Sequence, residues 1–300
     1  MDANDSILHY LTRPDGRLAY TLEGAGPLVI AVPGMGDLRS VYRDLAEPIV
    51  SAGYRLAVMD LRGHGDSDTT FSTHGDAITG SDILALIDEL GQPGVPGEPG
   101  EPGEPASVIG NSMSASAAAW AAAERPNSVS GLVLLSPFLR EPMAGAFAQA
   151  VMRALYRVMF ARPWGAALWV AYYGSLNKVT RSPWLEEHRR DIRRSFAQPD
   201  RLRSLRQLAV QLNHSEVESR LAEITAPALI MIGDHDPDFR SPATELAWGA
   251  EAINADGVLV PDAGHYPQSQ RPDVVVPAVL HFLAKTRPTA QNPAGAAADA

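Results

Sequence analysis

Runs of consecutive apolar residues recur along the chain, and amphipathic segments separate them. The apolar runs predict buried strands, which cover residues 27–34, 54–60, 106–110, 131–137, 227–234 and 257–262. The amphipathic segments predict helices, which cover residues 38–53 and 77–90 or begin near Met113, Pro242 and Pro272. Strands that are apolar throughout are typical of a sheet covered on both faces, and alternation with helices is typical of parallel strands. The pattern therefore predicts the α/β class, with a mostly parallel, doubly wound sheet.

Near the N-terminus two strand-like segments follow each other without a helix between them. Residues 7–12 and 17–24 flank Pro14, Asp15 and Gly16, a triplet that favours a tight turn. We expect these two segments to form a strand pair.

A long segment, about residues 140–220, interrupts the alternation and contains no strand-like run. In its first part, apolar residues share one face of a predicted helix and two arginines lie opposite. The apolar residues are Val151, Leu155, Val158 and Met159, and the arginines are Arg153 and Arg157. Such a helix can pack on a sheet or lie on a membrane surface. We favour packing, so the segment is predicted to be a helical lid subdomain on the edge of the sheet.

Between a predicted helix and a predicted strand, residues 93–105 repeat glycine at every third position. Connections at such places are usually about two to six residues long. The repeats are too few for a stable collagen helix, which also needs three chains, so we interpret the run as an inserted surface loop. The chain then divides into a first core part at residues 1–139, the lid at 140–220, a second core part at 221–286 and a tail, predicted to be disordered, at 287–300.

The composition excludes several kinds of partner and of chemistry. The net charge is −10, whereas nucleic acid requires a basic surface, so no nucleic-acid partner is expected. Cysteine is absent, which excludes disulfides, thiolate metal sites and thiol catalysis. No apolar run reaches the roughly 18 residues of a membrane span, and the acidic N-terminus is unlike a secretory signal. We expect a cytoplasmic monomer or homodimer without a membrane span.

The sequence VIGNSMSAS at residues 108–116 places Ser112 between a predicted buried strand and a predicted helix. A nucleophile elbow holds a serine in a strained turn of this kind and requires small residues two positions before and after it. Gly110 and Ser114 meet that requirement. Ser114 is the poorer nucleophile candidate, because it lies further into the helix. A serine that only caps a helix is the alternative, which the local sequence leaves open.

Partners for a serine nucleophile occur after later strands. Hydrolysis by serine requires a histidine that takes the hydroxyl proton and a carboxylate that orients the histidine. Asp234, Asp236 and Asp238 follow one predicted strand, and His265 follows the next. Because the carboxyl ends of parallel strands meet at one edge of a sheet, we expect these side chains to lie near Ser112.

Five motifs, in order along the chain, resemble those of the α/β-hydrolase family. They are VPGMG at 32–36 for the oxyanion turn, DLRGHGDSD at 60–68 for the loop after the next strand, GNSMS at 110–114 for the elbow, GDHDPDF at 233–239 for the acid loop and AGHYPQSQRP at 263–272 for the histidine loop. The resemblance covers nearly all of the chain except the lid and the glycine-rich insert. It departs from the family pattern at Pro33, where many members have histidine, and at Ser114, where the elbow usually has a second glycine.

The resemblance implies a role for each of these residues. Ser112 is the expected nucleophile and His265 the expected base. Asp236 rather than Asp234 is the expected acid, because the family's acid lies three residues after the loop glycine, which is Gly233 here.

The resemblance also implies an oxyanion hole made by the N–H groups of Met35 and Met113. No cofactor is expected, and no metal, since no His, Asp and Glu cluster shows ligand spacing. We expect a hydrolase of a small carboxylic ester, thioester or lactone with an apolar acyl part. Alternatives on the same triad are carbon–carbon or amide hydrolysis, perhydrolysis and cofactor-free oxygenation. A ligand receptor with slow turnover is an alternative of another class, and the fold alone does not choose among them.

The other histidines and the lid aromatics show no comparable pattern. His64, between two glycines, is interpreted as a loop residue, and His235 as a surface residue. No partner pattern is visible for His9, His74, His188, His214 and His281. An acyl pocket and simple lid packing explain the lid aromatics equally well, and these are Trp164, Trp169, Tyr172 and Tyr173.

Overall fold

One sheet of eight strands organises the part of the chain that the computed structural model describes, which is residues 7–91, 104–141 and 145–287. The strand order is β1-β2-β4-β3-β5-β6-β7-β8, and β2 alone runs antiparallel to its neighbours. The strands are β1 (Leu8–Arg13), β2 (Gly16–Gly24), β3 (Leu28–Val32), β4 (Arg55–Met59), β5 (Ala106–Asn111), β6 (Val129–Leu135), β7 (Ala228–Gly233) and β8 (Asp256–Val260). The predicted mostly parallel α/β sheet is confirmed.

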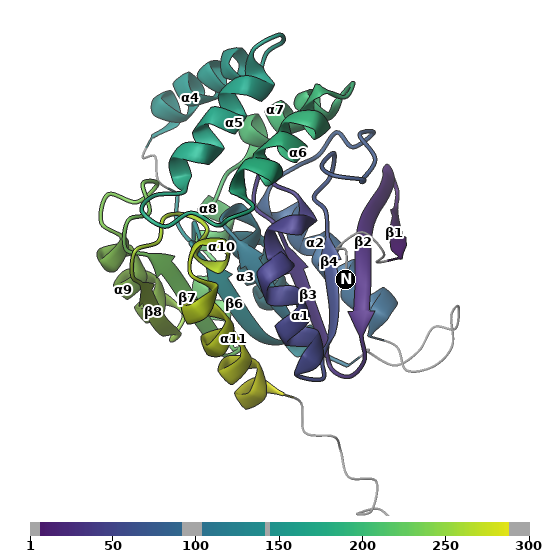
Figure 1. Cartoon of the computed structure of the whole chain (residues 1–300), viewed down its shortest axis with the longest axis vertical. Coiled ribbons are helices and arrows are strands. Elements are labelled where there is room, and N and C mark those ends of the chain that lie inside the picture. The colour runs from purple at the N-terminus through teal and green to yellow at the C-terminus, as the bar shows by residue number, and fades with distance from the viewer. Residues whose placement is uncertain (1–6, 92–103, 142–144, 288–300) are drawn as a thin grey trace, which may run out of the picture.

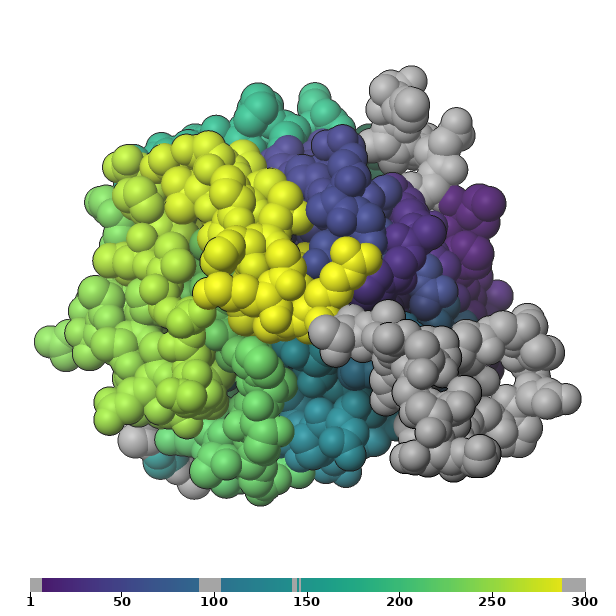
Figure 2. Space-filling model, turned by 90° about the horizontal axis from the view of Figure 1, so that it is seen from below, coloured from purple at the N-terminus to yellow at the C-terminus, as the bar shows by residue number. Residues whose placement is uncertain are grey.

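Helices cover both faces of the sheet (Figure 1). On one face lie α1 (Arg43–Ser51) and α11 (Pro272–Thr286), which are side by side in the view from below in Figure 2. On the other face lie α2 (Asp76–Leu90), α3 (Met113–Glu124) and α9 (Pro242–Ala252). The arrangement is doubly wound, as the alternating pattern predicted.

Strand β3 shows why the central runs are apolar without interruption. Ile30 and Val32 belong to the apolar cluster under α2 and α3, whereas Val29 and Ala31 belong to the cluster under α1 and α11. Successive side chains of a strand point to opposite faces, and here both faces are buried. A polar residue at any of these positions would therefore lie in an apolar cluster.

Between β6 and β7 the chain leaves the sheet and forms helices within residues 140–220, the segment that the sequence predicts to be a lid and that we call the lid below. The lid lies above the edge at which the parallel strands end (Figure 1). Its helices are α4 (Ala146–Met159), α5 (Gly165–Leu176), α6 (Leu185–Ala197), α7 (Arg201–Gln211) and α8 (Ser215–Glu218). The inner faces of α5, α6 and α7 join the cluster on the α1 side of the sheet, through residues such as Trp169, Phe196 and Leu205.

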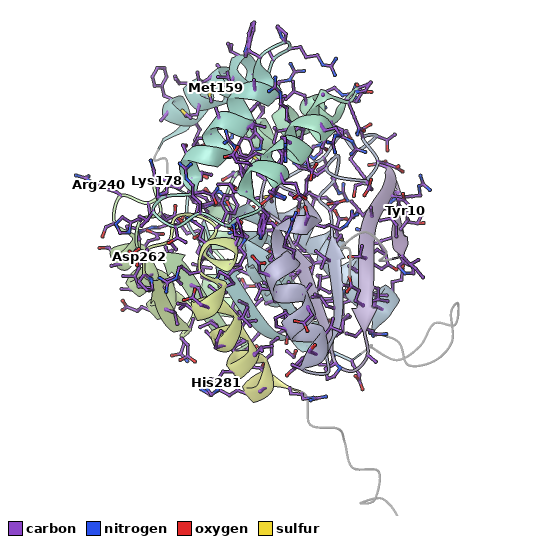
Figure 3. All side chains as sticks on the ribbon, viewed as in Figure 1. Tyr10, Met159, Lys178, Arg240, Asp262 and His281 are labelled. Atoms are coloured by element: carbon purple, nitrogen blue, oxygen red, sulfur yellow. The ribbon has the colours of Figure 1, made fainter. Side chains whose placement is uncertain are left out.

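Helix α4 differs from the expectation that its apolar face packs on the sheet. Val151, Leu155 and Val158 are exposed, and Met159 is half-buried. The helix contacts α5 and α7 rather than a strand, and Figure 3 shows Met159 near the top of the lid. The other lid helices thus separate α4 from the sheet that it was expected to cover.

Two sequence expectations lie mostly outside the described residues. The glycine-rich insert at 93–105 and the tail at 287–300 are described only at Glu104, Pro105 and Arg287.

Among the helices that the structure describes, none has the length and apolar character of a membrane span. Three short 3₁₀ helices complete these elements, at Arg39–Tyr42, Pro126–Ser128 and Leu221–Glu223, and a further short helix, α10, spans Pro267–Gln270.

Candidate active site

Ser112 occupies the sharp turn between β5 and α3. Its φ of 57° and ψ of −126° lie in a region that residues with a side chain rarely adopt, a strain of about 1–3 kcal/mol. Gly110 permits the turn, because a Cβ atom at that position would lie 2.4 Å from the carbonyl oxygen of Ser114. The Ser112 side chain is half-buried, and its hydroxyl makes no hydrogen bond with any described residue. The elbow thus presents an unengaged hydroxyl at the carboxyl end of β5.

Ser114 and Pro33, the two residues that depart from the family pattern, contact each other in the structure. The Ser114 hydroxyl donates a hydrogen bond of 2.6 Å to the carbonyl oxygen of Pro33. A glycine at position 114 could not donate this bond. The turn at residues 32–36 also lies against the nucleophile, since a Cβ atom at Gly34 would lie 3.1 Å from Cβ of Ser112. Ser114 therefore ties the elbow helix to this turn.

Two backbone N–H groups beside Ser112 have no acceptor among the described residues. Met113 is the first residue of α3, where an N–H has no partner within the helix. Met35 lies in the turn that faces Ser112, and its N–H is also unpaired within the described chain. Both N–H groups can therefore donate a hydrogen bond to an anionic oxygen. At Met113 the helix N-terminus also favours a bound anion.

His265 and Asp236 form a buried pair. Nδ1 of His265 lies 2.8 Å from Oδ2 of Asp236, and both side chains are almost inaccessible. The other Asp236 oxygen accepts a hydrogen bond of 3.0 Å from the N–H of Asp238. Asp234 instead contacts Nδ1 of the exposed His235 at 2.7 Å. The structure brings Asp236, and not Asp234, to the imidazole.

The loops that carry Asp236 and His265 approach each other closely at Gly233, and the histidine loop also contacts the elbow. A Cβ atom at Gly233 would lie 2.1 Å from the carbonyl oxygen of Gly264, so a larger residue would separate the acid loop from the histidine loop. The Asn111 side chain, one residue before Ser112, donates hydrogen bonds to the carbonyl oxygens of His265 at 3.3 Å and Leu135 at 3.0 Å. The histidine loop is therefore held directly against the elbow.

Two carboxylates set the charge state of the imidazole. Burial lowers the pKa of His265, but the negative charges of Asp236 and Asp238 outweigh burial and raise that pKa to about 9. Asp238 lies 3.6 Å from the imidazole Nδ1, and it accepts a hydrogen bond of 2.5 Å from the Tyr172 hydroxyl on α5. The imidazole is thus mostly protonated at neutral pH, and a lid residue contacts one of the groups responsible.

The same three side chains form a cluster that could hold a metal ion. The ligand atoms of Asp236, Asp238 and His265 lie within 4.8 Å of one another. The sequence did not indicate such a cluster, because its members come from two loops whose contact depends on the fold. A metal on Nδ1 would replace the hydrogen bond to Asp236, whereas the 2.8 Å separation suits that hydrogen bond. We therefore interpret the cluster as a histidine oriented by carboxylates.

His64 is a loop residue, as the sequence indicated, but it is also buried and contacts the turn at residues 32–36, which the sequence did not indicate. The N–H of Gly36 donates to Nε2 of His64 at 3.1 Å, so the ring proton resides on Nδ1, which donates to the carbonyl oxygen of Arg62 at 2.9 Å. Burial lowers the pKa of His64 to about 4, which keeps the ring neutral. His64 therefore fixes the turn that contains Met35.

The lid reaches the same turn through buried polar contacts. Oδ1 of Asp37 lies 2.6 Å from Nε2 of His188 on α6, and Oδ2 accepts a hydrogen bond of 3.2 Å from the Tyr173 hydroxyl on α5. Nε1 of Trp169 donates to the carbonyl oxygen of Gly36 at 2.8 Å. These contacts could not be predicted from the sequence, because the partners belong to elements far apart in the chain.

Comparisons with known proteins are consistent with this architecture. A probable esterase from Oryza sativa subsp. japonica is 26% identical over 274 residues, which cover 87% of this chain and 93% of that protein. A 2-hydroxy-6-oxo-6-phenylhexa-2,4-dienoate hydrolase from Comamonas testosteroni is 26% identical over 297 residues, with coverage of 94% and 93%. The solved enol-lactonase from Burkholderia xenovorans has a TM-score of 0.74 at 20% identity and covers 92% of this chain and 100% of that one. The family model described as the alpha/beta hydrolase family matches residues 29–278, and the chain belongs to that family.

Proposed function

We propose that the protein is a serine hydrolase that cleaves a small carboxylic ester, thioester or lactone with an apolar acyl part. The observation that carries the proposal is the buried 2.8 Å pair of His265 and Asp236 beside a serine in a strained turn. A nucleophile, a base and an orienting carboxylate are the groups that acyl transfer requires. The likeness to an esterase and an enol-lactonase supports the choice of an ester or lactone.

The proposed reaction follows from the roles of these groups. The Ser112 hydroxyl attacks the substrate carbonyl and transfers its proton to Nε2 of His265, while Nδ1–H stays bonded to Asp236. The N–H groups of Met35 and Met113 bind the oxyanion, and each such donor lowers the barrier by about 3 kcal/mol. The imidazolium then protonates the leaving alcohol or thiol, and water releases the acid from the acyl-enzyme by the same steps. Because this hydroxyl makes no hydrogen bond among the described residues, the bond to His265 has to form when substrate binds.

A second candidate is hydrolysis of a carbon–carbon bond on the same triad. The specific observation in its favour is the likeness to the Comamonas testosteroni dienoate hydrolase over nearly the full length of both chains. Both candidates use Ser112, Asp236 and His265, so they differ in the substrate and not in the residues.

A substrate panel tests the proposal. We expect p-nitrophenyl esters or lactones to be turned over faster than 2-hydroxy-6-oxo-dienoates, and Ser112→Ala to lower kcat on the order of 10⁴-fold or more. A fluorophosphonate should add mass to a peptide at Ser112, and Ser114→Ala, the matched control, should still be labelled. Faster turnover of the dienoate would select the second candidate. Turnover below about 1 s⁻¹ on every substrate would favour a receptor instead, and labelling at Ser114 would contradict the assignment of the nucleophile.

A further inference from the structure

The outer surfaces of α4 and α5 are apolar along their length. Seven of the twelve large apolar side chains that are exposed in the described chain gather on these two helices, and we call the seven the apolar stripe. They are Phe147, Val151, Leu155 and Val158 on α4, with Trp164, Leu168 and Tyr172 at the start of α5 and along it. Phe147 is 84% exposed and Val158 is 61% exposed. Single exposed apolar residues are common, but a contiguous group of them marks an interaction surface.

The two halves of the stripe meet where the helices are connected. Nε1 of Trp164 donates a hydrogen bond of 2.9 Å to the carbonyl oxygen of Val158, so the end of one half contacts the start of the other. The large side chains recur at spacings of four and three on α4 and of four along α5, and exposed alanines lie between them. The helix pair forms the top of the molecule in Figure 1, farthest from the end of α11.

Charge is distributed unevenly over the same region. Residues 140–220 contain 14 of the 25 basic residues but only 7 of the 35 acidic ones, a net charge of +7 in a chain of −10. No acidic residue occurs from 142 to 185, a segment that contains the whole stripe. Helical spacing puts Arg153 and Arg157 on the side of α4 opposite its part of the stripe, and neither forms an ion pair within the described chain.

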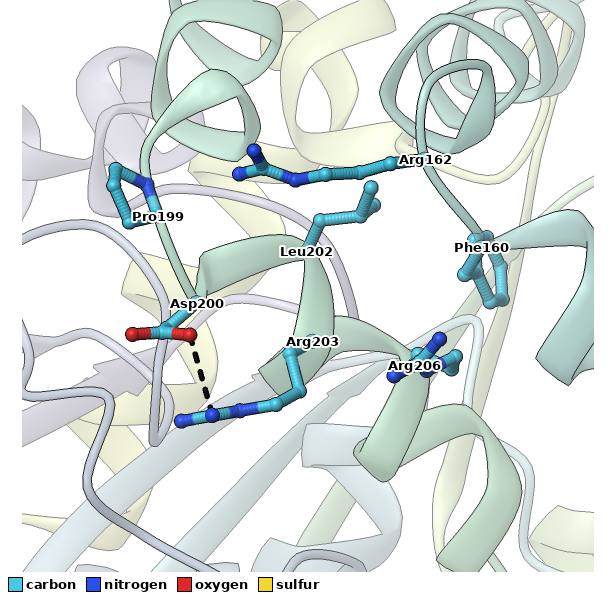
Figure 4. Close-up of a pocket in the computed structure, with 7 residues that line it drawn as sticks. All are labelled: Phe160, Arg162, Pro199, Asp200, Leu202, Arg203 and Arg206. Atoms are coloured by element: carbon cyan, nitrogen blue, oxygen red, sulfur yellow. Dashed lines mark ion pairs between the residues drawn. The ribbon is translucent and has the colours of Figure 1, made fainter.

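Further positive charge surrounds a cavity at the connected end of the helix pair (Figure 4). The cavity has a volume of about 310 Å³, and Phe160 and Leu202 supply its apolar lining. Arg203 is paired with Asp200 at 3.2 Å, but Arg206 has no ion pair among the described residues. Arg162, two residues before Trp164, also lines the cavity. Arg162 donates a hydrogen bond of 3.1 Å to the carbonyl oxygen of Gln198, and like Arg206 it has no ion pair within the described chain.

We propose that the apolar stripe docks on a lipid surface that carries anionic headgroups. A helix with an apolar face and arginines on its polar face binds at the boundary between headgroups and acyl chains, where basic side chains nearby meet phosphates. Since no described helix has the length and apolar character of a span, the contact is with the surface of the membrane. This binding does not depend on the chemistry at Ser112.

Two other occupants fit these observations less well. A second copy of the chain would bring the same surface against itself, so the basic residues of 142–185 would approach each other without acidic partners in that segment. A specific protein partner needs polar groups in the contact for register, and Tyr172 is the only member of the stripe with a hydroxyl, which Asp238 already engages. A lipid surface requires neither acidic partners on this chain nor a fixed register.

Vesicle flotation tests the proposal. The probes are vesicles of phosphatidylcholine with and without phosphatidylglycerol, at low and high salt. We expect the protein to float with the anionic vesicles and to bind less at high salt, because exposed charges are then screened. Phe147→Ser and Leu155→Ser should each lower the partition coefficient about tenfold, whereas Leu259→Ser, a matched change on exposed β8, should not. Arg157→Gln should weaken binding to anionic vesicles, and Arg240→Gln, also exposed, should leave it unchanged.

Several results would overturn the proposal. One is a wild-type protein that does not float, and another is equal flotation of wild type and the stripe variants. A third is sedimentation as a dimer that Phe147→Ser abolishes, without any vesicle binding, since this would identify a second copy as the occupant. The altered residues are exposed, and circular dichroism of each variant checks that it is folded.

Discussion

The sheet and the lid bury their apolar residues in different ways. In β3 every residue is buried, because helices cover both faces of the strand. In the lid, α5 buries Trp169 and Tyr173 on one side and exposes Leu168 and Tyr172 on the other. The apolar side chains of a central strand are buried only when both faces of the sheet are covered. Those of an amphipathic helix are buried as soon as one face of the helix is covered.

The lid and the sheet region also differ in the sign of their net charge. The lid holds 14 basic and 7 acidic residues, which leaves 11 basic and 28 acidic residues for the remainder of the chain. The three groups proposed to react, Ser112, Asp236 and His265, all belong to the acidic sheet region. The lid instead contacts groups that surround them, through Tyr172 on Asp238 and Trp169 on Gly36. We therefore expect changes in the sheet region to abolish turnover, and changes in the lid to alter its rate.

The largest expected effect lies in the sheet region. Asp236→Asn should lower kcat on the order of 10⁴-fold, because the amide can no longer hold the imidazole with its proton on Nδ1. Asp234→Asn, on the same loop, is the matched control and should stay within about tenfold of wild type, since its carboxylate contacts exposed His235. Steady-state kinetics on the preferred ester measures both variants. Equal losses would show that the 2.8 Å contact does not identify the acid.

A smaller effect is expected where the lid contacts the turn. Trp169→Phe keeps an aromatic ring beside Gly36 but removes the hydrogen bond from Nε1 to the Gly36 carbonyl oxygen. The turn that carries Met35 should then be held less accurately, and we expect kcat to fall about 10- to 100-fold. Trp164→Phe alters an exposed tryptophan and should leave kcat unchanged. A fall in KM alone, with kcat intact, would contradict a positioning role for the lid.

The activity should depend on pH through His265 and the carboxylates beside it. The neutral imidazole is the base, so kcat/KM should rise with pH up to the His265 pKa of about 9. Asp238→Asn removes a negative charge 3.6 Å from the ring, so the rise should move to lower pH. Tyr172→Phe breaks the contact with the lid but keeps the carboxylate, and its profile should not move. A shift in the second variant and none in the first would assign the effect to the lid contact.

The same raised pKa predicts a change of stability with pH. Because the folded protein binds the His265 proton more tightly than the unfolded chain, this group stabilises the fold fully below its ordinary pKa of 6.5. The contribution should be lost as pH rises through about 9, and Asp238→Asn should make the loss smaller. Thermal midpoints measured from pH 6 to 10 check the sign, and a midpoint that rises over this range in wild type relative to Asp238→Asn would contradict it.

The smallest effect is expected for the glycine-rich insert. The N–H of Glu104 donates a hydrogen bond of 3.0 Å to the carbonyl oxygen of Gly91, so the two ends of the run already meet. Replacing residues 93–102 by a few flexible residues should change the free energy of unfolding by about 1 kcal/mol or less, because loop-closure entropy varies slowly with length. Denaturant unfolding and ester hydrolysis of the deletion variant are the measurements. Lost activity with unchanged stability would show that the insert contributes to the site.

The sequence predicted the features that depend on local pattern. Apolar runs such as residues 227–234 predicted the central strands, and the spacing of Asp236 from Gly233 selected the carboxylate that contacts His265. It did not predict His64 at the turn, because burial of a histidine between glycines depends on which element packs over it. It also did not predict that α4 faces solvent, because the apolar pattern identifies the face of a helix but not what covers that face.

The contact between Gly36 and Trp169 has a kinetic consequence. Gly36 has a φ of 71°, and a Cβ atom there would lie 2.2 Å from the indole, so the ring rests directly on the backbone of the turn. An outward movement of α5 therefore removes both this packing and the hydrogen bond to the Gly36 carbonyl oxygen. A state with α5 moved outward would then exclude a fully formed turn, and the two states would be in equilibrium. If α5 moves in this way, we expect the time that it spends on the turn to set the interval in which a bound substrate can react, and its outward movement to allow product release.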